Sequence, residues 1–483
     1  MAVLEHLDPK DVFYYFEEIC RIPHGSGNTG QISDYLVNFA RERNLSYIQD
    51  ELGNVIIRKP AAPGYENVPG VILQGHMDMV AEKTPESDHD FTKDGLKLKI
   101  TEDGYITAED TTLGGDDGIA IAYGLALLAG DYPHPALELL VTVDEEIGML
   151  GASGLDCSQL QGRRMINLDS EEEGSIWVSC AGGMRALSRI PVEYTAGEGV
   201  QYTLKISGLL GGHSGSEIDK IRCNANILMG RVLYGLKEAA DYEILSLAGG
   251  AKDNAIPREC TAEILVPKDQ KDAVEAYARQ AEEELRTEYQ NTDDGVRVEA
   301  ICTGEGEGQV LTPVSREKVI FYLMNLPNGV QKMSGNIPGL VETSANLGIL
   351  RLTSQALEGK SCVRSSVKSG KTALSQKMEY LTEFLGGEYE VSGAYPAWEY
   401  KQESPLRDLM VQVYEEMYQS SPQVVAIHAG LECGLLYSNI PGLDCVSIGP
   451  NMKDIHTTEE VLEIASVKRV WEYLLRVLEQ MRK

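Results

Sequence analysis

The strongest constraint on the fold is a set of polar residues that each follow a short apolar stretch. These residues carry metal-binding or proton-transfer groups: His76, Glu145, Glu146 and Asp169. In open α/β sheets, ligands bind beyond the carboxyl ends of the strands, so residues that are distant in sequence can meet there. The pattern therefore predicts an α/β domain with one polar site at a sheet edge.

Both ends of the chain have the alternating pattern of such a domain. Hydrophobic spacing predicts helices at residues 11–20, 32–43, 119–129, 405–418 and 458–482. Apolar runs predict strands at residues 54–58, 68–74, 137–143, 165–168, 424–427 and 445–448. In the last helix, Thr458 is expected to be the cap, with Glu459 and Glu460 in the first turn. This alternation favours an α/β fold with a mixed, largely parallel sheet and helices on both faces.

The middle of the chain has a different pattern. Alternating strands are expected at residues 202–206, 262–266, 296–301 and 344–350, and polar-faced helices at 273–289 and 372–385. We therefore expect an α+β domain at residues 184–397, inserted into a domain formed by residues 1–183 and 398–483. The two halves of the insert have similar content, so an internal duplication is one interpretation.

The composition of the chain disfavours some classes of binding partner and indicates the cellular compartment of the protein. A net charge of −31 disfavours nucleic acid and anionic membranes as partners, because both would be repelled. The nine cysteines are scattered without a CxxC pair, which fits reduced thiols. The first residues lack a signal-peptide pattern, and apolar runs such as residues 119–129 are too short to span a bilayer. We expect a cytoplasmic protein.

A glycine-rich box at residues 111–118, Thr-Thr-Leu-Gly-Gly-Asp-Asp-Gly, completes the metal-binding set. Paired metal hydrolases hold two cations about 3.5–4 Å apart through a shared carboxylate. Asp116 is the expected bridge, because the backbone of a glycine-rich turn can approach the metals closely. We assign one metal to His76, Asp116 and Asp169, and the other to Asp116, Glu146 and His456. Histidine with carboxylates suits zinc best, and manganese or cobalt would also suit so oxygen-rich a site.

Two further acids have expected catalytic roles. Asp78 lies two residues after His76 and can orient the imidazole by accepting its free ring proton. Glu145 adjoins the ligand Glu146 but points elsewhere in extended chain. We expect Glu145 to be the general base, which takes a proton from a metal-bridging water and delivers it to the leaving nitrogen.

The chain resembles the M20 metallopeptidases, and within them the aminoacyl-histidine dipeptidase branch. The motifs that carry the resemblance lie at residues 73–80, 111–118, 145–149, 167–174, 211–215, 254–258 and 428–434. The resemblance implies a zinc-peptidase-like catalytic domain with two metals, an inserted lid domain, and unblocked dipeptides as substrates, including those with a C-terminal histidine. It also implies a cis peptide bond after Asp116. The branch usually has Asp-Asn in the box, where this chain has Asp116-Asp117.

The resemblance also implies roles for residues of the lid. His213 is expected to reach the scissile carbonyl oxygen when the lid closes, and Asn254 to bind the substrate backbone. Arg258 or Arg364 would clamp the terminal carboxylate. Glu432 would bind the free amine or cap a helix that begins near Ala429, and His428 has no favoured role. A homodimer through the lid domain is one arrangement that the resemblance allows.

Two alternative functions remain open at this point. The first is another amide hydrolase on the same scaffold, such as an aminopeptidase or an N-acyl amino acid deacylase. The second is a metal-dependent binding or assembly module without catalysis. A comparison of the hydrolysis of Ala-His or β-Ala-His with that of N-acyl amino acids and tripeptides distinguishes a dipeptidase from the first alternative. Loss of hydrolysis in Glu145→Gln with metal still bound would exclude the second.

Overall fold

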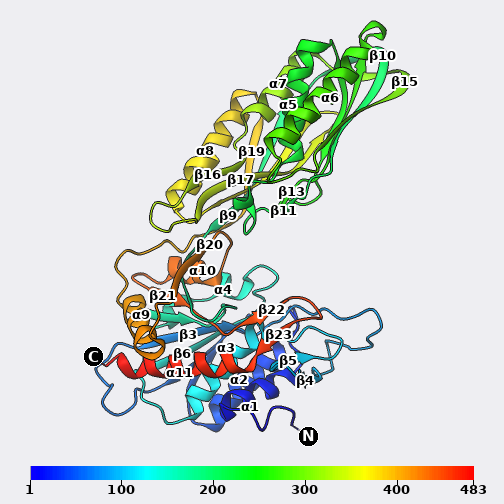
Figure 1. Ribbon diagram of the computed structural model, residues 1–483. Coiled ribbons are helices and arrows are strands. Elements are labelled where there is room, and N and C mark those ends of the chain that lie inside the picture. Colours follow the sequence, from blue (N-terminus) through cyan, green and yellow to red (C-terminus); the bar gives the residue numbers. More distant parts are fainter. Residues whose placement is uncertain (1, 483) are drawn as a thin grey trace. The chain divides into compact units, whose positions relative to one another are not determined.

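The computed structural model describes residues 2–482 of the 483-residue chain. These residues form two compact units. Unit 1 consists of residues up to Ser179, Tyr400–Ala426 and Leu431 onward, and unit 2 consists of Cys180–Glu399 and Ile427–Gly430. Each unit has its own sheets and helices (Figure 1). The inserted domain at residues 184–397 stays a prediction from the sequence.

Unit 1 is built on an eight-stranded mixed sheet with the order β1-β2-β6-β3-β7-β21-β8-β20. Its strands are β1 Ser46–Gln49, β2 Val55–Lys59, β3 Val71–His76, β6 Leu137–Thr142, β7 Arg164–Asn167, β8 Ser175–Cys180, β20 Gln423–Ile427 and β21 Asp444–Ser447. The central pairs, β6 with β3, β3 with β7 and β7 with β21, are parallel. The outer pairs β1 with β2 and β2 with β6 are antiparallel. The mixed, largely parallel sheet predicted from the sequence is therefore confirmed at its centre.

Burial explains why these segments are strands. Every residue of β3 and β6 is buried, as expected for the centre of a parallel sheet covered on both faces. The helices of this unit are α1 Lys10–Cys20, α2 Gly30–Glu42, α3 Gly115–Ala129, α4 Leu150–Gly154, α9 Pro405–Tyr418, α10 Glu432–Asn439 and α11 Ile464–Gln480. Helix α3 contacts β3 and β6, and α9 contacts β21.

A small second sheet of unit 1 corrects one prediction. Its strands are β4 Leu98–Ile100, β5 Tyr105–Ala108, β22 Met452–Lys453 and β23 Val461–Glu463, in the order β22-β23-β5-β4. The expected helix at residues 458–482 was therefore wrong at its start, because residues 461–463 pair with β5 and β22 and α11 begins only at Ile464. Thr458 is not its cap.

Unit 2 is built on a nine-stranded sheet with the order β15-β10-β14-β12-β17-β18-β9-β19, with β16 paired to β17. Its strands are β9 Gly182–Pro191, β10 Tyr194–Ser207, β12 Glu243–Gly249, β14 Cys260–Val266, β15 Arg297–Leu311, β16 Gly329–Met333, β17 Val341–Leu352, β18 Ala356–Ser365 and β19 Glu388–Tyr395. A separate short pair consists of β11 Gly212–His213 and β13 Ala255–Ile256. The helices are α5 Ala225–Ala239, α6 Lys271–Glu288, α7 Pro313–Asn325 and α8 Lys368–Phe384, and they gather on one face of the sheet (Figure 1).

The two halves of this sheet repeat one order of elements. The first half runs β10-α5-β12-β14-α6-β15 and the second runs β9-α7-β17-β18-α8-β19. In each half the first strand lies between the third and the fourth, and the second strands β12 and β17 pair where the halves meet. A common order of elements is what a duplication would produce, although the duplication itself stays a prediction.

No helix within residues 2–482 combines the length and the apolar character that a membrane crossing requires.

Candidate metal centre

The parallel strands at the centre of unit 1 end at one edge of the sheet. His76 is the last residue of β3 and pairs in register with Thr142, the last residue of β6. Asn167 ends β7 on the other side of β3. The segments that follow β6 and β7 carry the acids expected at the site: Glu145, Glu146 and Asp169. Strand direction and register thus bring His76 together with these acids.

Asp116 is brought to the same edge by the first turn of α3. Gly114, which precedes this helix, has a left-handed φ of 67°, a conformation that glycine adopts at no steric cost. The peptide bond between Asp116 and Asp117 is cis, as the resemblance implies. Gly75 must lack a side chain here, since a Cβ atom would lie 2.4 Å from Asp117 Oδ2.

The two oxygens of Asp116 face two different imidazoles. His76 Nε2 lies 3.1 Å from Oδ1, and His456 Nε2 lies 3.1 Å from Oδ2. His456 Nε2 is also 2.7 Å from Glu146 Oε1, and His76 Nε2 is 3.4 Å from Asp169 Oδ1. Asp116 therefore lies between the two imidazoles. Among the described residues, the ligand atoms close enough to hold one ion are those of His76, Asp116 and Glu146, and those of His76, Asp117 and Asp169.

These residues fit divalent cations. Burial raises the pKa of Asp117 well above its usual range, and repulsion by Asp169 raises it further. Burial also raises the pKa of Asp169, despite the nearby His76 imidazole. So many carboxylates can remain ionised in a buried site only if positive charge is supplied there. Ligand atoms about 3 Å apart are also what one cation with bonds of about 2.0–2.2 Å gathers around itself.

Asp78 links the imidazole of His76 to the acidic loop. His76 Nδ1 donates to the backbone oxygen of Asp78 at 2.9 Å, and Asp78 Oδ1 lies 3.4 Å from the same nitrogen. The Asp78 carboxylate also accepts from the backbone N–H groups of Glu145 (2.9 Å) and Glu146 (3.3 Å) and from the Ser26 hydroxyl (2.8 Å). One buried carboxylate therefore holds both the histidine side and the glutamate side of the site.

Glu145 differs from its neighbour Glu146 because its carboxylate faces neither His76 nor His456 within ion-pair distance. Burial raises its pKa to about 7, against the attraction of the His76 imidazole. Two bound cations would lower that pKa again through their positive charge. Glu145 is thus a half-buried acid beside the ligands that is free to exchange a proton.

In unit 2, His213 presents a ring nitrogen that can donate a hydrogen bond. Its Nδ1 accepts from the backbone N–H groups of Gly215 (3.2 Å) and Ser216 (3.1 Å). The proton of the neutral ring therefore resides on Nε2. Burial, followed by the charge of Arg364, lowers the pKa of His213 and favours this neutral form.

Asn254 and Arg258 lie beside His213. The backbone oxygen of Asn254 accepts from Ser214 N–H at 2.9 Å, and β11 pairs with β13 through His213 and Ala255. All three side chains line a cavity of about 750 Å³. Asn254 and Arg258 are exposed, so both are accessible to a ligand.

Arg364 is buried in unit 2 without an acidic partner. Its side chain is 7% exposed and donates to the hydroxyl of Tyr395 at 2.9 Å. Within residues 2–482, no carboxylate lies within ion-pair distance of it, and its Nε is unpaired. A Cβ atom on Gly215 would lie 3.1 Å from Arg364 Nε and 3.0 Å from His213 Cε1. Arg364 and His213 therefore flank the same glycine.

Two residues of the 428–434 motif are buried. Glu432 is fully buried at the start of α10, and its Oε2 accepts from Gln74 and Thr142, both at 2.6 Å. It does not cap this helix, whose N-cap is Leu431. His428 Nε2 lies 2.7 Å from the Ser344 hydroxyl, and burial lowers its pKa to about 4.

Sequence reasoning missed the contributions of two acids. Asp117 Oδ2 accepts the backbone N–H of His76 at 3.1 Å and so fixes the end of β3. Glu460, expected in the first turn of a helix, is instead buried against the glycine-rich box. The local sequence carries no signal that would have indicated this contact of Glu460.

The family model for peptidase family M20/M25/M40 matches residues 72–480. The chain belongs to this family. The M20 resemblance inferred from the motifs is therefore confirmed, and it extends over both units.

Individual proteins are also similar to this chain over the full length. The cytosol non-specific dipeptidase of Escherichia coli (strain K12) is 38% identical, with 99% of each chain covered. The crystal structure of aminoacylhistidine dipeptidase from Vibrio alginolyticus has a TM-score of 0.94 at 36% identity, and the match covers 99% of this chain and 98% of that one. An aminopeptidase PepT from Bacillus cereus has a TM-score of 0.56 at 15% identity over 99% of this chain and 100% of that chain, so this likeness concerns the fold alone.

Proposed function

We propose that this M20 peptidase hydrolyses the peptide bond of unblocked dipeptides, including Xaa-His dipeptides, in a metal-dependent reaction. The observation that carries the proposal is Asp116, whose two oxygens each face a different histidine at 3.1 Å. Two proteins that match this chain over the full length, from Escherichia coli and Vibrio alginolyticus, bear the names of dipeptidases. The name of the E. coli relative supports a cytoplasmic location.

Two metal ions are the proposed cofactors, with zinc preferred over manganese or cobalt. His76, Asp116 and Asp169 would hold one ion, and Asp116, Glu146 and His456 the other. When bound, the ions supply Lewis acidity that polarises the substrate carbonyl and makes water a better nucleophile at neutral pH.

The protein's own groups move the protons and bind the substrate. Glu145 accepts the proton of the attacking water and delivers it to the leaving nitrogen. Asp78 fixes the backbone of Glu145 and the ring of His76. The Nε2–H group of His213 would donate a hydrogen bond to the carbonyl oxygen and so stabilise the negative charge that develops on it. Unit 2 is accordingly proposed to be the lid domain.

For the C-terminal carboxylate of the dipeptide, we favour Arg364 over Arg258. Arg364 is 7% exposed and has no acidic partner, so its guanidinium lacks the solvation of the exposed Arg258 and a carboxylate gains more by pairing with it. Asn254 is proposed to bind the substrate backbone. Glu432 is fully buried and bound to Gln74 and Thr142, so an amine-binding role would require it to be uncovered.

Arg364→Met is expected to raise KM for Ala-His about 10–100-fold, since loss of a hydrogen bond to a charged group costs about 1.5–3 kcal/mol. Arg258→Met should change KM less than threefold. Steady-state kinetics on both variants test this assignment. A larger effect of Arg258→Met would transfer the carboxylate site to Arg258.

A dipeptide panel on metal-stripped protein tests the function as a whole. The protein is reconstituted with one ion at a time and assayed with Ala-His, β-Ala-His, tripeptides and N-acyl amino acids. We expect turnover of free dipeptides only when metal has been restored. Preferred turnover of N-acyl amino acids or tripeptides would replace the proposal by a deacylase or an aminopeptidase, and full turnover after thorough chelation would exclude a metal-dependent enzyme.

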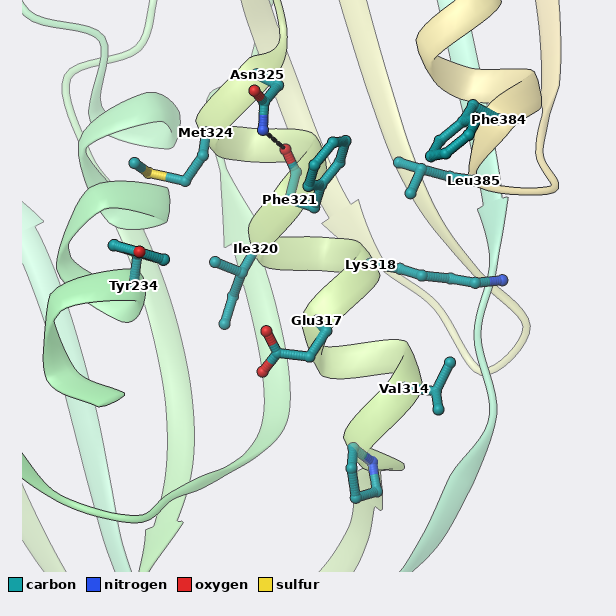
Figure 2. A pocket seen from close by; sticks show the side chains of 11 residues that line it. Tyr234, Val314, Glu317, Lys318, Ile320, Phe321, Met324, Asn325, Phe384 and Leu385 are labelled. Atoms are coloured by element: carbon teal, nitrogen blue, oxygen red, sulfur yellow. Dashed lines mark hydrogen bonds between the residues drawn. The ribbon is translucent and has the colours of Figure 1, made fainter. Parts of the chain in front are cut away.

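We further propose that unit 2 carries a homodimer interface. Apolar side chains that are exposed on α5, α7 and α8 surround a cavity of about 770 Å³ (Figure 2): Tyr234, Val314, Phe321, Met324 and Phe384. Glu317 and Lys318 point to different sides of α7 (Figure 2), and Glu317 pairs with Lys237 at 2.6 Å. In a two-fold dimer the same patch meets itself, so the apolar side chains of one copy can pack against those of the other. An exposed apolar patch of this kind favours a second copy of the chain as the occupant.

Phe321→Glu is expected to convert such a dimer into a monomer, because it places a charge in the buried centre of the interface. Sedimentation velocity at several concentrations measures the state of association. Leu52→Glu, at an exposed leucine in unit 1, is the matched control and should leave the dimer intact. A wild-type chain that sediments as a monomer at micromolar concentration would refute the interface.

A further inference from the structure

Glu460 connects two segments of the metal centre that are distant in sequence: the glycine-rich box at residues 111–118 and the segment that carries His456. It follows His456 by four residues, and its side chain is buried beneath the glycine-rich box. Four consecutive backbone N–H groups donate to its carboxylate, those of Leu113 (2.7 Å), Gly114 (3.1 Å), Gly115 (2.8 Å) and Asp116 (3.4 Å). The last of these donors is the residue whose side chain faces both histidines.

Burial raises the pKa of Glu460, whereas the hydrogen bonds from the N–H groups of Leu113, Gly114 and Gly115 stabilise its negative charge. The first N–H groups of a helix have no partners within the helix, and its dipole attracts anions at this end. Glu460 takes that place at the start of α3, which has no cap from its own sequence. Gly115 allows the approach, since a Cβ atom there would lie 3.3 Å from Glu460 Oε1. A neutral amide could not accept from all four donors with equal strength.

The backbone of Glu460 is held equally firmly on the other side. Its N–H donates to the oxygen of Thr457, and its own oxygen accepts from the Thr107 hydroxyl at 2.8 Å. Immediately after it, β23 pairs with β22 and β5. His456 itself has a positive φ of 62° and a side chain that is 42% exposed, so little packing holds its ring.

We propose that Glu460 is a positioning residue that fixes Asp116 relative to His456 and so sets the affinity for the ion shared by Asp116, Glu146 and His456. The inference rests on the proposed two-ion centre. The ion at His76 and Asp169 depends on it less, because His76 ends a fully buried strand and is held by Asp78. Glu460 therefore acts selectively on one of two adjacent sites.

The test is a metal titration of the full-length chain carrying Glu460→Gln. Metal-stripped protein is titrated with Zn²⁺ by calorimetry, and in parallel with Co²⁺ by visible absorption, which reports the geometry around each ion. We expect the weaker of two binding events to lose about 10–100-fold in affinity, as is usual for groups that orient metal ligands. The tighter event should change less than threefold. Excess metal should restore most of kcat, with KM for the dipeptide unchanged.

Controls separate this role from general stability and from the proposed function. Glu459→Gln changes the adjacent, exposed glutamate and should bind both ions as the wild type does. Glu460→Asp keeps the charge but shortens the side chain. If Glu460→Gln does not fold, the affinities of Glu460→Asp for the two ions are measured instead. Equal weakening of both ions, or of neither, would overturn the inference. If the wild type binds fewer than two ions, the two-ion centre itself fails, which is a different result.

Discussion

Glu145→Gln is expected to lower kcat for dipeptide hydrolysis by about 10²–10⁴-fold, the usual contribution of a general base. Glutamine has nearly the same shape but cannot accept the proton of the attacking water. Its backbone N–H still donates to Asp78 Oδ1, as that of Glu145 does at 2.9 Å, so the loop that carries Glu146 should keep its position. Two ions per chain should remain bound, as measured by elemental analysis after dialysis.

This combination of results distinguishes a proton-transfer group from a metal ligand. Glu51→Gln changes an exposed glutamate of unit 1 between β1 and β2, and it should retain wild-type kcat. If Glu145→Gln lost an ion together with its activity, Glu145 would be a ligand, and the assignment of the base would have to be abandoned. Retention of kcat within a few-fold would show that another group accepts the proton.

Asp116→Asn is expected to abolish tight binding of both ions and, with it, activity. Each Asp116 oxygen faces one histidine at 3.1 Å, so the loss of one negative charge affects both ligand groups at once. We expect each affinity to fall by more than ~100-fold, beyond the range for residues that only orient ligands. Competition with a chromophoric chelator measures both affinities.

The adjacent residue provides a matched control for this substitution. Asp117→Asn removes a charge at the next position, but its amide oxygen can still accept the His76 N–H that Asp117 Oδ2 accepts at 3.1 Å. We expect at most a tenfold change in either affinity, within the lower part of the range for orienting groups. An effect as large as that of Asp116→Asn would mean that Asp117 itself ligates an ion.

The convergence of His76, Glu146 and Asp169 could be predicted from the sequence because it depends on strand direction. Each residue ends or closely follows an apolar strand, and neighbouring parallel strands end at one edge of a sheet. The central pairs of β3 with β6 and β7 have this arrangement. The family and the fold could also be predicted, because the motifs are specific to the family and the hydrophobic periodicity of the helices and strands is strong.

The segment around Glu460 could not be predicted in the same way. Thr458, Glu459 and Glu460 resemble the start of a helix, and the helical periodicity of α11 follows closely after them. The local preference is overridden by contacts with a distant part of the chain: Glu460 binds the N–H groups of the glycine-rich box, and residues 461–463 pair with β5. Neither partner can be recognised from the local sequence.

The buried environment of Glu432 was also beyond sequence reasoning. A glutamate at the start of a helix is typically an exposed residue or a cap. Its burial depends on Gln74 and Thr142, which lie on β3 and β6 and belong to otherwise apolar runs. Polar residues inside such strands indicate a buried partner, but the sequence does not show which acid supplies it.

The position of β21 in the sheet of unit 1 has a consequence for synthesis of the protein. β21 lies between β7 and β8, although residues 181–443 separate it from both in the sequence. On the ribosome, unit 2 can fold as soon as it emerges, since domains generally fold as units during translation. Until β21 has been synthesised, the backbone N–H and C=O groups that β7 and β8 will pair with β21 have no partner strand. His456 emerges later still. A growing chain therefore has no complete catalytic site, and its unpaired strands are exposed to chaperones until translation is nearly finished.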